Sequence, residues 1–130
     1  MARYDRKIIE EISLKLAEGL QDDITGVYAK YPDGMLASQY PFIVITRLNA
    51  NDINRFIRHL DLLINIVSDD PSGAEALDIS ETIGDLLEDW YKTTRLDIMG
   101  EPTLNNVEDS DDRDTRVSAQ LDFQMDYLEQ

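Results

Sequence analysis

The densest group of side chains that could do chemistry is an acidic run from Glu108 to Asp114. Asp109, Asp111 and Asp112 supply closely spaced carboxylates, and carboxylate oxygen is the ligand type that Ca²⁺ prefers. An EF-hand loop also needs a glycine at its turn and a glutamate at its last position, and this run contains neither. We therefore predict a solvated loop here rather than a metal site.

His59 is the only histidine, and an imidazole can act as a general base near neutral pH. The chain has no cysteine, and no serine and aspartate are spaced to suggest a catalytic triad with His59. We interpret His59 as an exposed residue on the polar side of a strand. The six glycines form no phosphate-binding loop, and with 27 Asp and Glu residues a close carboxylate pair is expected by chance. The sequence thus predicts a protein that is not an enzyme and binds no cofactor.

Composition restricts the partners of the chain. Its 130 residues predict one domain, 1–130, and its formal net charge is -15. Such a charge repels phosphate, which excludes a protein that grips duplex DNA but not one that surrounds DNA without holding it. The lack of cysteine fits a reducing compartment. The first residues form no apolar signal core and no apolar run is long enough to span a bilayer, so we expect synthesis in the cytoplasm and no membrane partner.

Two segments have the apolar period of an amphipathic helix. The first spans 4–20 and Asp5 is the predicted cap, while the second follows a predicted capping box of Ser72 and Glu75. We expect Trp90, near the end of the second helix, to lie in the core rather than on a binding face. The apolar stripes are Ile8, Ile9, Ile12, Leu16 and Leu20 in the first helix, and Ala76, Ile79, Ile83, Leu86, Leu87 and Trp90 in the second.

The remaining segments predict strands separated by polar connections. Residues 26–36 read as a short strand running into a Pro32-Asp33-Gly34 turn, and the apolar run 42–45 reads as a strand buried on both faces. A long strand is predicted within 57–70 and a short one at 94–99. Residues 48–56 and 100–115 are predicted to be polar loops.

The clearest pattern is the strict alternation of apolar and polar residues from Val117 to Tyr127. It predicts a half-buried strand with one wet face. Because strands and helices do not alternate regularly along the chain, the fold class is α+β. We predict a single mixed or antiparallel sheet of about four to five strands with two main helices packed on one face.

This order of elements resembles the tail completion, or tail terminator, proteins of long-tailed bacteriophages. The resemblance covers most of the chain, and its most specific part is "YPFIVIT" followed by "LINIVSDDPSGAEALDISETIGDLL". It implies a structural virion protein that forms a homo-oligomeric ring, commonly a hexamer. The ring caps the tail tube, ends its polymerisation and joins the tail to the head–tail connector, and DNA passes through the lumen. The implied location is the tail or neck of the virion, after assembly in the host cytoplasm.

Under this resemblance, two polar loops become candidates for contact with the tube protein or connector, or for the lumen lining. An acidic lumen would let DNA slide because it repels phosphate. The candidate residues are Asn49, Asn51, Asp52, Asn54 and Arg55 in the first loop, and Glu108, Asp109, Asp111, Asp112, Arg113 and Asp114 in the second.

Two other functions remain open. One belongs to the same class: a head–tail adaptor or stopper protein of the neck, which would contact the portal side. The other is an acidic binding module, such as a DNA mimic whose carboxylates imitate phosphates. The net charge of -15 motivates this alternative, which predicts a monomer or dimer whose binding to a basic protein weakens steeply with salt.

Overall fold

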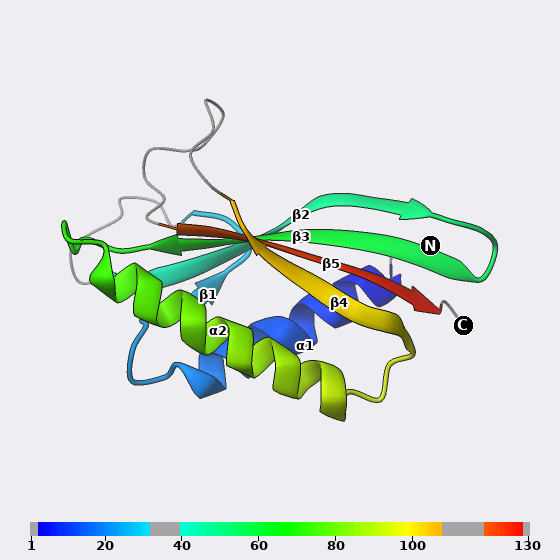
Figure 1. Ribbon diagram of the computed structural model, residues 1–130, viewed down its shortest axis with the longest axis horizontal. Helices are drawn as coiled ribbons and strands as arrows, with labels where there is room; N and C mark the ends of the chain where they lie inside the picture. The colour runs from blue at the N-terminus through cyan, green and yellow to red at the C-terminus, as the bar shows by residue number, and fades with distance from the viewer. Residues whose placement is uncertain (1–2, 32–39, 108–118, 129–130) are drawn as a thin grey trace.

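The computed structural model describes residues 3–31, 40–107 and 119–128, which form two layers (Figure 1). Five strands make one mixed sheet in the order β1-β2-β3-β5-β4, in which only β1 and β2 run parallel. Both helices pack on one face of the sheet, here called the inner face. The helices do not cover the opposite face, here called the outer face. The predicted α+β fold is confirmed. The elements are α1 Arg3–Gly19, β1 Val27–Tyr28, β2 Phe42–Asp52, β3 Ile57–Val67, α2 Ala74–Thr93, β4 Ile98–Asn106 and β5 Ala119–Leu128.

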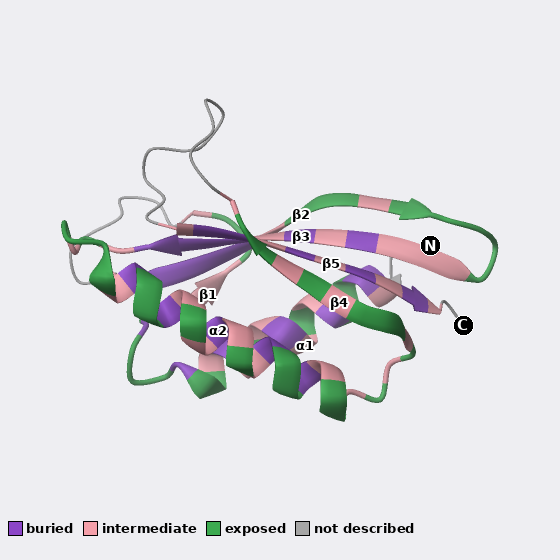
Figure 2. Cartoon of the chain, viewed as in Figure 1, coloured by how far each residue is buried: buried purple, intermediate pink, exposed green. Residues whose placement is uncertain are grey.

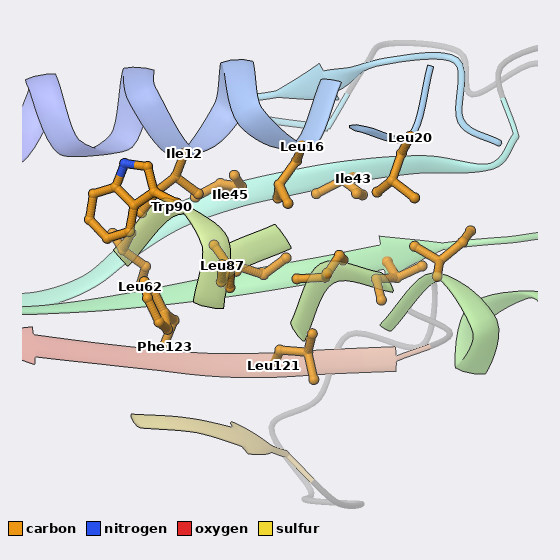
Figure 3. Packing of buried hydrophobic residues seen from close by; sticks show 14 of the residues in the cluster. Ile12, Leu16, Leu20, Ile43, Ile45, Leu62, Leu87, Trp90, Leu121 and Phe123 are labelled. Carbon is orange, nitrogen blue, oxygen red and sulfur yellow. The ribbon is translucent and has the colours of Figure 1, made fainter. Parts of the chain in front are cut away.

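The core lies between the helices and the inner face (Figure 3). The predicted helical stripes supply one wall, and the inward residues of the strands supply the other. Trp90 is buried and meets Phe123 of β5 edge to face, with ring centroids 6.3 Å apart, so its predicted place in the core is confirmed. The labelled core residues of Figure 3 are Ile12, Leu16, Leu20, Ile43, Ile45, Leu62, Leu87, Trp90, Leu121 and Phe123.

The start of β2 is buried on both faces, as its apolar run predicted. Ile43 and Ile45 join the inner core, whereas Phe42 and Val44 form a second, smaller cluster on the outer face with Val67 of β3. Half-buried aromatic residues pack against this cluster: Tyr28, Tyr31 and Tyr40.

The second half of β2 was predicted to be a loop, and this prediction is wrong. Residues 48–52 continue the strand, and Asn49, Ala50, Asn51 and Asp52 pair with β3 after a register shift near Leu48. Asparagine and aspartate disfavour strands, but the backbone of β3 offers a complete ladder of partners that outweighs this preference. The true connection is only the four residues 53–56, so β2 and β3 form a long hairpin.

The segment 100–106 was also predicted to be loop and instead belongs to β4. It pairs with β5 on both sides of a bulge between Met99 and Thr103, where Gly100 has a φ of 74°. Glycine adopts this left-handed backbone without strain, so the polar "GEPT" stretch bends the strand without ending it. The remainder of the predicted loop, 108–115, lies outside the described residues.

The predicted capping box of α2 does not form. The Ser68 hydroxyl donates to the Glu75 carboxylate at 2.6 Å, so Glu75 does not reach back to Ser72. The N-cap residue is Gly73, and the carboxylate of Asp70 accepts from the backbone N–H of Glu75 at 3.1 Å and from Ser72. These hydrogen bonds, the Glu75 amide first, hold the pKa of Asp70 below its usual range. A carboxylate outside the predicted capping box therefore accepts this hydrogen bond, because the turn before α2 places Asp70 beside the start of the helix.

The alternating C-terminal strand is confirmed over β5. Its apolar residues Leu121, Phe123, Met125 and Tyr127 are buried on the inner face, and Asp122, Gln124 and Asp126 lie half-buried on the outer face. Two parts of the predictions, residues 117–118 and the Pro32-Asp33-Gly34 turn, lie outside the described residues.

Candidate functional site

The candidate residues of the first predicted loop all lie in one place, the half of the β2–β3 hairpin that is nearest its turn. Asn49, Asn51 and Asp52 are on β2, and Asn54 and Arg55 are in the turn. Figure 1 shows this turn reaching beyond the ends of both helices, and Figure 2 shows that most of the adjoining half of β2 is exposed. The acidic candidates 108–114 lie outside the described residues.

The hairpin turn has a defined conformation that presents apolar side chains to solvent. The side-chain oxygen of Asn54 accepts from the backbone N–H groups of Phe56 and Ile57, at 2.8 and 2.9 Å. The backbone N–H of Ile53 donates to the carbonyl of Ile57 at 2.9 Å. Ile53 is 52% exposed and Phe56 57% exposed, with the Arg55 guanidinium 5.1 Å from the Phe56 ring centroid.

Sequence reasoning missed this apolar tip because it treated 48–56 as one polar loop. The signal was present: Ile53 and Phe56 flank Asn54, a residue suited to turns. A four-residue turn cannot bury two large side chains within itself. Ile53 and Phe56 share one turn, and contiguous exposed apolar side chains, unlike scattered ones, mark contact surfaces.

The base of the hairpin is tied to α1 by a buried carboxylate. Asp5 is 1% exposed, and Arg58 of β3 donates to both its oxygens at 2.8 to 3.0 Å. Tyr127 of β5 also donates to Asp5, Arg47 lies 3.3 Å away, and Arg58 extends the network to Asp52 at 2.9 Å. Asp5 was predicted to cap α1, but it lies within the first turn and binds these side chains instead.

The charges at this base support one another. Burial alone would raise the pKa of Asp5, but hydrogen bonds from Arg58 and Tyr127 and the positive charges of Arg58 and Arg47 outweigh it, so the pKa falls below its usual value. The same hydrogen bonds to Asp5 raise the pKa of Arg58 above its usual value. The network is therefore a permanently charged structural joint.

The outer face of the sheet carries the opposite arrangement, two carboxylates facing each other. Asp61 of β3 and Asp122 of β5 each have one shielded oxygen without a hydrogen-bond partner. Burial, together with the hydrogen bond and negative charge of Asp122, raises the pKa of Asp61 to about 7. Asp122 also accepts from Gln124 at 2.9 Å. The pair can therefore share a proton near neutral pH.

His59 lies beside this pair and is not the exposed residue predicted. Its side chain is 25% exposed, and its Nδ1 lies 2.7 Å from the carboxylate of Asp126, the residue opposite it on β5. Within the described residues, no hydroxyl is hydrogen-bonded to the imidazole. Farther along, Gln120 donates to Asn65 at 2.9 Å, which satisfies a buried polar pair on the same face.

A cavity of about 270 Å³ opens between α2 and the edge strand β4. Leu87, Leu104 and Phe123 form its apolar wall, and Glu88 and Glu101 lie at its lining. Glu88 pairs with Lys92 on the same helix at 2.9 Å, whereas Glu101 forms no salt bridge with any described residue. The cavity thus combines an apolar surface with an available negative charge.

The described residues contain neither a metal-binding cluster nor a membrane-spanning helix. Over 3–31, 40–107 and 119–128, no three His, Cys, Asp or Glu side chains are grouped to hold a metal ion. In the same ranges, neither helix combines the length and apolar character needed to cross a bilayer. Neither a scan against protein-family models nor a search of curated protein sequences finds a match for this chain.

Proposed function

We propose that the protein is a structural subunit of a phage tail: a ring-forming terminator that caps the tail tube and joins it to the head connector. The observation that carries the proposal is the one-sided packing of the sheet. Both helices cover the inner face, which leaves the polar outer side of β5 and a projecting apolar hairpin turn for neighbouring subunits. A closed ring needs two different patches on each subunit, and such a subunit offers them.

The order of elements supports the same proposal. The resemblance of the sequence to tail terminator proteins was based on this order of helices and strands. The charge supports it as well. A subunit with a net charge of -15 repels phosphate and so suits a ring through which DNA slides. A head–tail adaptor of the neck would use the same properties and differs in contacting the portal side.

The second candidate, of a different class, is an acidic module that binds a basic protein. The Asp61–Asp122 pair favours it, since a partner's lysine or arginine at this place would neutralise two carboxylates that repel each other. This function predicts a monomer or dimer and a complex that high salt dissolves.

The first experiment is the solution mass of the purified protein by light scattering over a range of concentrations, with electron microscopy of the same samples. The proposed function predicts a discrete mass several times the 14.9 kDa of the chain and annular particles. Mass and particles should persist in high salt if apolar contacts hold the ring. A monomer at every concentration, without annular particles, would contradict the ring and favour the acidic module.

A further inference from the structure

We propose that the hairpin tip of one subunit docks into the α2–β4 cavity of the next, with Phe56 inserted and Arg55 paired with Glu101. This inference rests on the proposed ring and names the contact that would close it. The tip is basic and apolar and the cavity is acidic and apolar, so the two surfaces are complementary and the proposed partner is a second copy of the chain.

The tip is built to insert. Asn54 fixes the turn through two backbone hydrogen bonds, so Phe56 is presented without further ordering. Little conformational entropy is then lost on docking. Ile53 stands on the same four-residue turn, and the two side chains together offer an apolar end that water now surrounds.

The cavity has the size and lining for a phenyl ring. Its volume of about 270 Å³ exceeds the ~150 Å³ of an apolar cavity known to admit benzene. Leu87, Tyr91, Pro102 and Leu104 would surround the ring, and Gly84 keeps the helix side open because it has no side chain. A Cβ placed on Gly84 would make an ordinary van der Waals contact with Leu104, at 3.8 Å, so a small side chain such as cysteine fits at this position.

Opposite charges on Arg55 and Glu101 add specificity to the apolar contact between the tip and the cavity. The Arg55 guanidinium lies over the Phe56 ring, so Arg55 approaches the cavity together with Phe56. In the cavity lining, Glu88 is paired with Lys92 at 2.9 Å, whereas Glu101 interacts with Lys92 through charge alone and forms no salt bridge, so we assign the guanidinium to Glu101. An arginine and a carboxylate in a partly shielded contact attract more strongly than on an open surface.

The arrangement is head-to-tail, because each subunit gives its hairpin to one neighbour and its cavity to the other. Contacts of this type propagate until a rotation closes them into a ring. The same pair of surfaces therefore accounts for association and for its termination.

Thiol cross-linking tests the contact directly, because the chain contains no cysteine. A Phe56→Cys protein mixed with a Gly84→Cys protein should form disulfide-linked heterodimers under mild oxidation. Leu77→Cys is the matched control, since Leu77 is on the same helix, is 58% exposed and does not line the cavity. Equal cross-linking of Phe56→Cys to both partners would overturn the contact.

Charge reversal provides a second test in the intact chain. Arg55→Glu and Glu101→Arg should each weaken self-association ~10-fold or more, and the chain carrying both should recover it. Glu81→Arg makes the same charge change on an exposed part of α2 and should leave association unchanged. Failure of the double variant to recover would contradict the Arg55–Glu101 pair.

The two proposals fail in distinguishable ways. A discrete ring mass without preferred cross-linking or charge rescue would overturn this contact and leave the terminator function standing. A monomer that shows neither would overturn both.

Discussion

Asp5 is buried and Asp61 is half-buried with one shielded oxygen, yet the two carboxylates have opposite chemistry. Asp5 is bound by Arg58 and Tyr127, and its pKa lies below the usual value. Asp61 faces Asp122, and its pKa rises to about 7. The comparison shows that the partner, rather than burial alone, decides whether a carboxylate keeps its charge. The first site completes itself within the subunit, whereas the second has unfilled hydrogen-bonding capacity on the face that the helices leave open.

The largest expected effect comes from removing the satisfied carboxylate. Asp5→Ala leaves Arg58 shielded without its counter-charge and should lower the free energy of unfolding by about 3–5 kcal/mol. Urea titration at pH 7 measures it. Glu10→Ala is the control, because it breaks only the exposed Arg6–Glu10 pair and should cost less than about 0.5 kcal/mol. Similar losses for both variants would contradict a structural role for the Asp5 network.

The pH dependence of Asp5 follows from the direction of its pKa shift. Since the folded pKa is lowered, the stabilisation is present above the ordinary value of 3.8 and is lost as pH falls through the lower folded value. Asp5→Ala should therefore flatten this part of the acid limb of the stability curve.

Asp61 should show the reverse dependence and a smaller effect. Its folded pKa of about 7 lies above the ordinary 3.8, so the folded state binds the proton more tightly. Its contribution is full below 3.8 and is lost as pH rises through 7. Asp61→Asn should thus stabilise the protein by on the order of 1–2 kcal/mol more at pH 8 than at pH 4. An equal change at both pH values in urea titrations would refute the shared proton.

The smallest effect is expected from the neighbouring pair on the outer face. Asp126 is 41% exposed and lies opposite His59, so Asp126→Asn should lower the free energy of unfolding by less than about 1 kcal/mol. It is also the matched control for Asp61→Asn, since both replace an outer-face aspartate by its amide. A gain at pH 8 from Asp126→Asn equal to that from Asp61→Asn would mean that general charge reduction, rather than the Asp61–Asp122 contact, is responsible.

The hairpin extends the same comparison to function. At the base of the hairpin, Arg58 donates hydrogen bonds to Asp52 and Asp5. At its tip, Ile53 and Phe56 are exposed. A hydrogen-bonded base that holds exposed apolar side chains in place suits a contact with another molecule. The candidate residues Asn49, Asn51 and Asp52 belong to this supporting strand, and Asn54 shapes the turn.

Periodicity determined the two helices, the long β3 and the alternating β5, and a continuous apolar run determined the buried start of β2. The periodic segments repeat apolar residues with the period of their own geometry, so burial of one face requires no knowledge of neighbours. The α+β class and the placement of both helices on one face followed from their order. The apolar tip at Ile53 and Phe56 could also have been recognised, because both residues are visible in the sequence.

Only the tertiary structure decided the rest. Residues 48–52 and 100–106 are strands because β3 and β5 lie beside them, and their polar sequences show no period of their own. Asp5 meets Arg58 and Tyr127 across 53 and 122 positions of sequence, and Asp61 and Asp122 are diagonal neighbours because β3 and β5 pair. Local chemistry chooses the elements, but contacts between distant segments choose which charges are satisfied and which remain for a partner.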